Sequence, residues 1–336
     1  MADEPAESAP CSGPGDSRSH SGSERPGEGG GVRHVMADEL VAGQRIDNYL
    51  LRELSGIPKS RIYRMLRKGE VRVNGGRVKP TYRLQSGDTL RIPPVRDAAP
   101  ATPTATFIGD KLLTAVERAI LYEDEHLLAL NKPAGLAVHG GSGLAFGVIE
   151  VLRRLRPDDA LALAHRLDRD TSGCLLVAKD RATLLALHRA LRERTVSKQY
   201  VAAVHGSWPR RLRTVRLALE RYHTPSGERR VRVSGSGKPS RTDFEVLAQG
   251  GSATLVRAHL HSGRTHQIRV HAQASGHPVV GDEKYATPEQ LALAASKGIK
   301  RLCLHAETLV FEHAGRRLRL TAELPVDFQE AWALLS

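Results

Sequence analysis

The chain has 336 residues, of which 40% are hydrophobic and 26% are charged, so it is long enough and apolar enough for two domains with separate cores. Its formal net charge of +13 favours a polyanionic partner, and nucleic acid is the polyanion we expect because no amphipathic membrane anchor is visible. No apolar run reaches the roughly 18 residues of a membrane helix. The three cysteines are widely spaced, which argues against a disulfide framework or a zinc knuckle. These features predict a cytoplasmic protein.

The chain is predicted to begin with a disordered tail that leads into a small module. Residues 1–34 are rich in Gly, Ser, Pro and Glu, so they offer little apolar surface to offset the entropy of ordering. In the module, residues 40–94, apolar side chains recur at helical spacing over 46–54, and a second helix begins at Pro58 and ends at Gly69. Alternating valines, an Asn-Gly turn and a short last strand follow, so we expect two helices against a small hairpin sheet.

The second predicted helix of this module has one apolar face and one positive face. Between Lys59 and Arg83 there are nine Lys or Arg residues and a single acidic residue, Glu70, which suits contact with several phosphates. The order of helices, turn and strands, together with the Gly-Glu-Val-Arg-Val-Asn-Gly segment, resembles an S4 RNA-binding domain. The resemblance implies that RNA is bound by Arg45, Lys59, Arg61, Arg64, Lys68, Arg72 and Asn74.

A flexible linker over residues 95–107 is predicted to lead to one larger unit, residues 108–336. Short apolar runs there are typical of strands, and they are separated by few helical patterns. The predicted strands cover residues 127–130, 174–178, 200–204, 244–247 and 253–260, and the predicted helices lie around 145–155, 181–193 and 287–297. This pattern predicts an α+β fold with a mostly antiparallel sheet.

The segment from His165 to Gly173 is a charged loop that leads directly into an apolar run. Such a loop can hold an ionised carboxylate among arginines at the rim of a sheet, where it can act as nucleophile or base. Asp168 is the carboxylate that we single out. Taken alone, the loop also fits a solvated turn, and His165 with Asp168 and Asp170 could imitate a metal site. No HExxH pair, dinucleotide fingerprint or P-loop accompanies it, so we expect no metal and no nucleotide cofactor.

Four segments occur in an order and at spacings that resemble the RluA-type pseudouridine synthases. They are Asn131–His139, His165–Gly173, Ser197–Tyr200 and Ser262–His271, and the resemblance extends from about residue 119 to 314. It implies the pseudouridine synthase fold, an α+β fold with a mostly antiparallel mixed sheet. With an S4 domain in front, the chain is similar to the family members that modify large-subunit (23S) ribosomal RNA.

The resemblance implies an isomerisation that breaks the N1–C1′ bond of uridine, turns the base and joins C5 to C1′. Because neither net oxidation nor hydrolysis occurs, no cofactor is required. The family motifs assign the role of nucleophile, base or charge stabiliser to Asp168, with Arg269 lying against it. Tyr200 would stack under the uracil, and its hydroxyl would help to move the C5 proton; without the resemblance, a tyrosine at the start of an apolar strand would be read as core.

A stacked uridine must leave the RNA helix to reach a carboxylate, and the resemblance implies that Arg166 fills the gap. Arg264 and His266 are expected to contact backbone phosphates, although both also fit polar residues at a sheet edge. The remaining residues expected to bind substrate are His165 and Gln267.

Three alternatives remain open from the sequence. The chain could be a related large-subunit synthase with a different target uridine, a non-catalytic S4 factor for ribosome assembly, or a metal-dependent phosphoesterase. The expected partner is 23S ribosomal RNA or the assembling 50S particle, no membrane is expected to be involved, and the expected oligomeric state is a monomer.

Overall fold

The structure is a computed structural model that describes residues 31–37, 41–54, 57–94, 108–140 and 146–336. The chain divides into two compact units, one ending at Thr104 and one beginning at Ala105. The predicted linker over 95–107 and most of the predicted tail lie outside the described residues. Among the helices of the described segments, none is long and apolar enough to cross a membrane.

The N-terminal unit contains two helices and a three-stranded antiparallel sheet. The helices are α1 (Ile46–Glu53) and α2 (Lys59–Lys68), and the strands are β1 (Arg33–Met36), β2 (Arg72–Val73) and β3 (Thr89–Ile92). The sheet order is β1-β3-β2. The sequence pattern predicts no strand at β1 and places Arg33 and His34 in the tail. The side chains of β1 are mostly exposed and lack apolar alternation, so the strand is defined by backbone pairing to β3, which the sequence pattern does not reveal.

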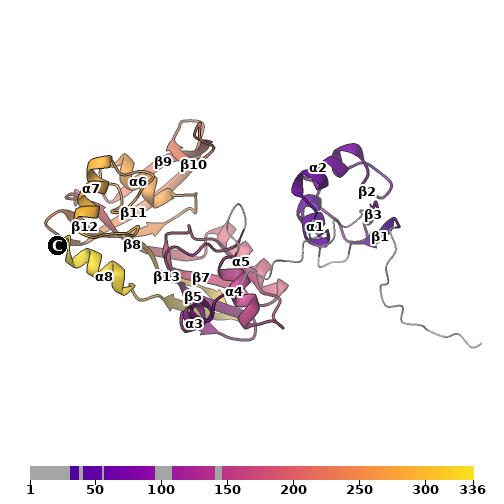
Figure 1. Cartoon of the computed structure of the whole chain (residues 1–336), viewed down its shortest axis with the longest axis horizontal. Helices are drawn as coiled ribbons and strands as arrows, with labels where there is room; N and C mark the ends of the chain where they lie inside the picture. Colours follow the sequence, from indigo (N-terminus) through magenta and orange to yellow (C-terminus); the bar gives the residue numbers. More distant parts are fainter. Residues whose placement is uncertain (1–30, 38–40, 55–56, 95–107, 141–145) are drawn as a thin grey trace, which may run out of the picture. The chain divides into compact units, whose positions relative to one another are not determined.

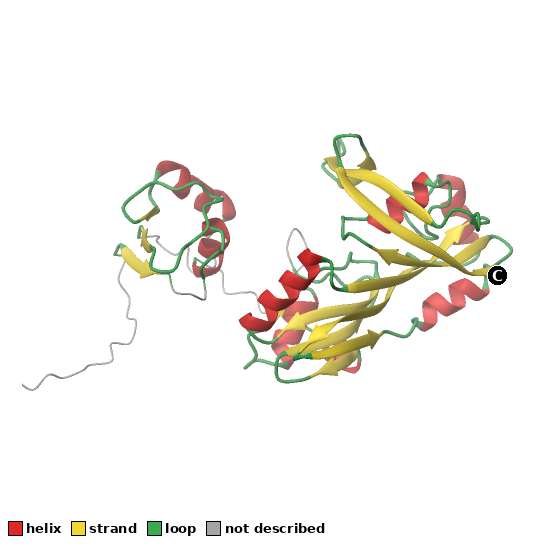
Figure 2. Cartoon of the chain, turned by 180° about the vertical axis from the view of Figure 1, so that it is seen from behind, coloured by secondary structure: helices red, strands yellow, loops and turns green. Residues whose placement is uncertain are grey.

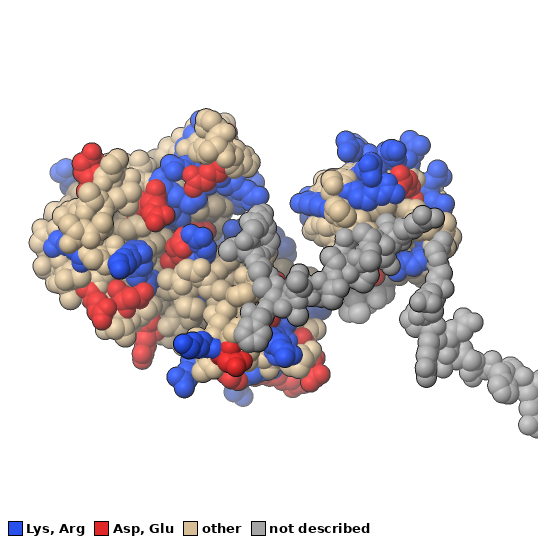
Figure 3. All heavy atoms as spheres, in the orientation of Figure 1, with Lys and Arg blue, Asp and Glu red and all other residues tan. Residues whose placement is uncertain are grey.

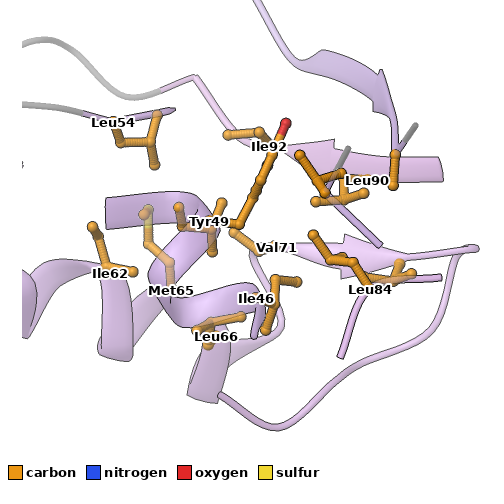
Figure 4. Close-up of a cluster of buried hydrophobic side chains, with 14 residues drawn as sticks. Ile46, Tyr49, Leu54, Ile62, Met65, Leu66, Val71, Leu84, Leu90 and Ile92 are labelled. Atoms are coloured by element: carbon orange, nitrogen blue, oxygen red, sulfur yellow. The ribbon is translucent and has the colours of Figure 1, made fainter. Parts of the chain in front are cut away.

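The core of this unit is formed by the apolar faces of both helices and by the sheet (Figure 4). As predicted, Ile62, Met65 and Leu66 are the buried residues of α2. The predicted tight turn is also present: Asn74 and Gly75 have φ angles of 49° and 77°, and Val73 and Gly76 exchange two backbone hydrogen bonds across it. The left-handed backbone at both central residues explains the Asn-Gly pair.

The larger unit is built on one 11-stranded sheet, which Figure 2 shows with helices on both faces. Its main order is β10-β9-β11-β12-β8-β13-β7-β5-β4, with β14 paired to β13 and β6 paired to β7. All pairings are antiparallel except that between β13 and β7. The strands are β4 (Ile120–Glu123), β5 (Leu127–Lys132), β6 (Ala162–Leu163), β7 (Ser172–Ala178), β8 (Ser197–His205), β9 (Thr214–His223), β10 (Arg229–Val233), β11 (Lys238–Gln249), β12 (Ala253–Leu260), β13 (Leu304–His313) and β14 (Arg316–Thr321).

The five predicted strands and the three predicted helices of this unit are all present, so the predicted α+β class with a mostly antiparallel sheet is confirmed. Three further helices were missed, and the most important is α6, because its buried face includes Gln267, Arg269 and His271 and therefore shows no apolar periodicity. The helices are α3 (Asp110–Arg118), α4 (Val148–Leu155), α5 (Arg181–Glu193), α6 (Gln267–Ala274), α7 (Pro288–Ser296) and α8 (Val326–Ala333).

The central strands β5, β7, β8 and β13 are labelled in Figure 1, and their alternate residues pack against opposite layers of helices. In β5, Leu128 and Leu130 pack in the cluster that includes α3 and α4, whereas Leu127 and Ala129 pack in the cluster that includes α5. In β8 the even-numbered residues face α6, and the odd-numbered ones face α7 and α8. Tyr200 contacts both the α3–α4 cluster and the α6 cluster, so it marks where the two cores meet on one face of the sheet.

Candidate active site

The loop that carries Asp168 is anchored to β7 and closed by a bond within the loop. At its beginning, His165 Nε2 accepts a hydrogen bond from the backbone of Leu176 at 3.1 Å. Inside the loop, Leu167 is buried in the α3–α4 cluster, and the backbone N–H of Thr171 donates to the carbonyl oxygen of Asp168 at 3.2 Å. These anchors close a tight turn with the Asp168 side chain at its surface, so the carboxylate is held by rigid structure.

Lys132 connects two of the sequence motifs through buried hydrogen bonds. Its side chain is 0% exposed, and Nζ donates to the carbonyl oxygens of Pro133 and Leu136 at 2.8 Å and of Arg169 at 2.9 Å. Burial lowers the pKa of Lys132 to about 7, although Asp170 and Asp168 act in the opposite direction. Through Lys132, the Asn131–His139 motif therefore supports the loop of Asp168. The sequence analysis assigns no such role to a residue of this motif.

The carboxylate of Asp168 lies between a guanidinium and an imidazole. Its Oδ2 is 3.6 Å from Nη1 of Arg269 and 3.6 Å from Nε2 of His266, and its side chain is 22% exposed. The structure thus places Arg269 against Asp168, as the sequence motif predicts. It also brings His266 to the same oxygen, whereas the sequence had suggested a phosphate contact for that residue. The carboxylate is partly open to the cleft and has nitrogen donors on its protein side.

Arg269 is fixed by a second carboxylate that the sequence did not single out. Its Nε and Nη2 donate to the two oxygens of Asp282 at 2.7 and 2.6 Å, and both side chains are buried. Burial by itself lowers the pKa of Arg269, but the paired carboxylate of Asp282 outweighs it, so the pKa is raised overall. This two-point contact leaves Nη1 to face Asp168. A buried arginine requires such a partner, but the sequence does not show which carboxylate supplies it.

Tyr285, three residues after Asp282, completes this side of the site. Its ring lies 5.1 Å from the guanidinium of Arg269 and 5.5 Å from the ring of His266, which it meets edge to face. Its hydroxyl is 2.7 Å from Nδ1 of His266 and accepts a hydrogen bond from the backbone of Val231 at 3.0 Å. The sequence pattern does not single out Tyr285.

Tyr200 lines the same cleft from the first half of β8. The side chain is half-buried. Burial is the main cause that raises the pKa of its hydroxyl, and the negative charge of the nearby Asp168 raises this pKa further. The phenol therefore stays protonated at neutral pH and can donate a hydrogen bond. Its ring packs on apolar residues of both cores. The position of Tyr200 is therefore compatible with both sequence-based interpretations, a flat surface for the uracil and a residue of the core.

The cleft above Asp168 has a volume of about 130 Å³ and a strongly basic rim. Arg166 and Arg264, both expected to bind substrate, line it. Arg221 on β9 lines the cleft too. The sequence pattern does not predict this, because Arg221 lies on a long two-stranded hairpin that only the tertiary structure places beside the cleft. Arg221 and Arg264 also line the adjoining cleft beside β10, so the two hollows form a continuous basic surface.

Two of the residues expected to bind substrate are used by the fold itself. The amide of Gln267 makes four hydrogen bonds: Oε1 accepts from Ser262 Oγ and the Arg264 backbone, and Nε2 donates to the Arg241 carbonyl and Thr242 Oγ1. This exhausts its ordinary capacity. His165 is tied to β7 and is not among the residues lining the cleft, and burial lowers its pKa to about 4. Gln267 lines the cleft with its amide bonded within the fold, whereas His165 supports the loop from outside the cleft lining.

His271, on the buried face of α6, gives the larger unit a pH-dependent stability. Its Nε2 is 2.9 Å from Ser240 Oγ, and burial lowers its pKa to about 4 from 6.5. His271 binds a proton near pH 6.5 in the unfolded chain but only near pH 4 in the folded chain. Its contribution to the stability of the larger unit is therefore complete above pH 6.5 and is lost as the pH falls towards 4.

We expect the free energy of unfolding to fall by about 2 kcal/mol between pH 7 and pH 5 through His271. Urea unfolding followed by tryptophan fluorescence measures this, since Trp208 and Trp332 both lie in the larger unit. The variant His271→Gln should show a shallower pH dependence than the parent, and equal slopes would contradict this assignment.

In the N-terminal unit, some of the residues expected to bind RNA are already paired within the fold. Arg45 donates to both oxygens of Asp47, Arg61 lies 3.3 Å from Glu70, and the amide of Asn74 bonds Asp88 and the Thr89 backbone. Arg72 donates to the carbonyl oxygens of Gly69 and Gly75. Lys59, Arg64 and Lys68 are exposed on α2, where Figure 3 shows the basic side chains of this unit gathered.

The alternative of a metal site at the Asp168 loop lacks the necessary geometry. His165 is turned to the backbone of Leu176, and within the part of the chain that the structure describes no group of three His, Cys, Asp or Glu side chains could hold a metal ion. The arrangement can instead provide an ionisable carboxylate, a protonated phenol and several guanidinium groups around a cleft.

Comparison with known proteins agrees with this geometry. Residues 126–274 match the family model of RNA pseudouridylate synthases, and residues 44–90 match that of the S4 domain. The chain belongs to the RNA pseudouridylate synthase family and carries an S4 domain. It is 54% identical over 298 residues to the ribosomal large subunit pseudouridine synthase C of Salmonella typhi, covering 88% of this chain and 92% of that protein.

The protein of the same name from Escherichia coli K12 is 52% identical over 296 residues, 87% of this chain and 92% of the relative. Among solved structures, the human RNA pseudouridylate synthase domain containing 4 is similar with a TM-score of 0.56 at 28% identity. That likeness covers 67% of this chain and 96% of the human one. The predicted pseudouridine synthase fold is therefore confirmed.

Proposed function

We propose that this protein converts uridine into pseudouridine at defined positions of 23S ribosomal RNA. The observation that carries the proposal is the carboxylate of Asp168, held 3.6 Å from the guanidinium of Arg269 at the floor of a basic cleft that Tyr200 also lines. The relatives named ribosomal large subunit pseudouridine synthase C support the ribosomal substrate, because they match nearly the whole chain. The same similarity favours this type of synthase over the related types with other target uridines.

The chemistry of the isomerisation suits these groups. As the N1–C1′ bond breaks, C1′ becomes electron-poor and the uracil becomes electron-rich, and the base must turn before C5 bonds to C1′. A carboxylate beside the sugar can stabilise the positive carbon, attack it, or remove a proton, and Asp168 is the carboxylate that the cleft offers. Neither net oxidation nor hydrolysis takes place, so the proposed reaction needs only this chain and the RNA.

We assign supporting roles to the other groups in the cleft. Arg269, immobilised by Asp282, attracts and orients the carboxylate of Asp168. Tyr200 provides a flat surface for the uracil, and its protonated hydroxyl can relay the C5 proton in the last step. Arg166, exposed at the mouth of the cleft, fills the space that the flipped uridine leaves in the RNA.

RNA outside the flipped nucleotide would be held by two basic surfaces. In the larger unit, Arg221 and Arg264 border both adjoining clefts and are placed to bind phosphates. In the S4 domain, for which we propose residues 40–94, exposed Arg64 and Lys68 on α2 serve the same purpose. We propose residues 108–336 as the catalytic domain.

Replacing Arg64 and Lys68 together by Gln should weaken RNA binding and flatten its salt dependence. Each phosphate contact releases counterions, so the slope of log affinity against log salt should decrease by roughly 1.5 for two lost contacts. Fluorescence anisotropy with a 23S fragment at several salt concentrations measures the slope. Arg64→Lys with Lys68→Arg preserves both charges and should retain it; an unchanged slope in the Gln variant would reject RNA binding by this face.

The test of the proposed function is a map of pseudouridines in 23S RNA from cells with and without the gene. Carbodiimide adducts on pseudouridine stop reverse transcription, so stops that disappear with the gene and return with it identify the targets. A non-catalytic assembly factor would leave the map unchanged, and a phosphoesterase would be inhibited by a chelator. Repeating the reaction in vitro with naked 23S RNA and with the assembling 50S particle decides which is the substrate. We propose that the enzyme acts in the cytoplasm as a monomer.

A further inference from the structure

His266 lies in the cleft with a different partner at each nitrogen of its imidazole ring. His266 is the residue immediately before α6, and its backbone is left-handed, with φ 52° and ψ 22°. A residue with a side chain pays a steric cost in this region, although histidine is among those that tolerate it better. In this conformation one ring nitrogen of His266 faces Asp168 and the other faces Tyr285.

The two nitrogens have different partners, and these determine where the imidazole proton resides. Burial lowers the pKa of His266 to about 4 despite the nearby Asp168, so the ring is neutral at physiological pH and carries one proton. Burial also raises the pKa of Tyr285 to about 12, so its hydroxyl keeps its hydrogen. Since that hydroxyl already accepts from the Val231 backbone, its hydrogen can be donated to Nδ1 of His266, 2.7 Å away.

The opposite tautomer would be unfavourable at both ends. It would direct the lone pair of Nε2 at a carboxylate oxygen of Asp168 3.6 Å away. At the other nitrogen, the Tyr285 hydroxyl would accept two hydrogen bonds, and the hydroxyl hydrogen would no longer have Nδ1 as its acceptor. With Nε2 protonated, Asp168 instead faces two N–H donors, one from His266 and one from Arg269.

We propose that Val231, Tyr285 and His266 form a hydrogen-bonded relay that fixes the Nε2–H tautomer of His266 and so positions the carboxylate of Asp168 for reaction. His266 and Tyr285 are positioning residues in this scheme, because they act through Asp168. The separation of 3.6 Å is slightly longer than a hydrogen bond, and such contacts commonly shorten when the substrate is bound. The inference rests on the proposed function only in its catalytic consequence, since the tautomer exists without substrate.

The tautomer can be measured directly in the full chain. Nitrogen-15 spectra of histidine side chains distinguish a protonated from an unprotonated ring nitrogen, and the His266 signals are assigned by their loss in His266→Asn. We expect Nδ1 to be unprotonated and Nε2 protonated in the parent protein. We expect Tyr285→Phe to shift His266 towards a mixture of tautomers. A protonated Nδ1 in the parent would overturn the proposal whatever the activity.

The consequence for catalysis is tested by two matched comparisons in single-turnover kinetics on a 23S fragment. Tyr285→Phe removes one hydroxyl and should lower the rate of the chemical step about tenfold, the equivalent of one hydrogen bond, with little change in apparent RNA affinity. Tyr122→Phe is the control, because its hydroxyl bonds Asp124 in a similar cluster with His313 outside the cleft. It should leave the rate unchanged, and an equal loss in both variants would contradict the relay.

The second comparison replaces His266 by the two amides. The amide nitrogen of Gln can occupy the place of Nε2 and donate to Asp168, whereas the shorter Asn reaches only the place of Nδ1 beside Tyr285. We therefore expect His266→Gln to retain more of the single-turnover rate than His266→Asn, and the reverse order would refute the relay. If the parent protein formed no pseudouridine in the 23S fragment, the proposed function would fail instead, while the tautomer measurement would stand or fall separately.

Discussion

Asp168→Asn should abolish pseudouridine formation while leaving RNA binding nearly unchanged. The substitution keeps the shape of the side chain and removes the ionised oxygen that faces Arg269, so the loss in single-turnover rate should exceed about 10³-fold. Binding should persist because the basic rim of the cleft, including Arg166, Arg221 and Arg264, is untouched. The rate is measured by release of tritium from C5-labelled uridine in a 23S fragment, and affinity by fluorescence anisotropy.

The matched control is Asp170→Asn, two residues along the same loop. The carboxylate of Asp170 pairs with the exposed Arg169 at 3.0 Å and lies outside the residues that line the catalytic cleft. This variant should keep most of the activity. Turnover that survives in Asp168→Asn, or that is lost equally in both variants, would remove Asp168 from its proposed role.

Asp282→Asn should produce the largest loss of stability among single changes near the site. It leaves the guanidinium of Arg269 buried without a counter-charge, and breaking a buried ion pair from one side costs about 3–5 kcal/mol. Urea unfolding followed by the fluorescence of Trp208 and Trp332 reports the larger unit. Activity should fall as well, because Arg269 would no longer be held with Nη1 towards Asp168.

Asp327→Asn provides the comparison for this prediction. Asp327 pairs with Arg301, but its carboxylate is 58% exposed, so its loss should cost less than about 1 kcal/mol. A similar cost for both variants would show that the burial of the Arg269–Asp282 pair does not matter. Full activity in a folded Asp282→Asn protein would show that Arg269 needs no second carboxylate.

The sequence by itself determined the parts of this protein whose signals are local. The apolar run 174–178 is a strand because a strand buried between two layers must be apolar on both sides. The Asn74–Gly75 turn follows from its own backbone requirements, and α2 follows from its amphipathic pattern. The loop around Asp168 was recognisable because its charged residues stand directly before a buried strand, and the motif resemblance to the synthase family is confirmed.

The tertiary structure decided which polar groups meet. Asp282 and Tyr285 are far along the chain from Asp168 and are brought to it only because α6 packs on the sheet, and α6 itself gave no apolar periodicity. The side-chain amide of Gln267 makes four hydrogen bonds within the fold. The residue type alone does not predict these partners. A local pattern records burial along one element, whereas the partner of a buried charge or amide is chosen by long-range packing, and that choice exists only once the chain has folded.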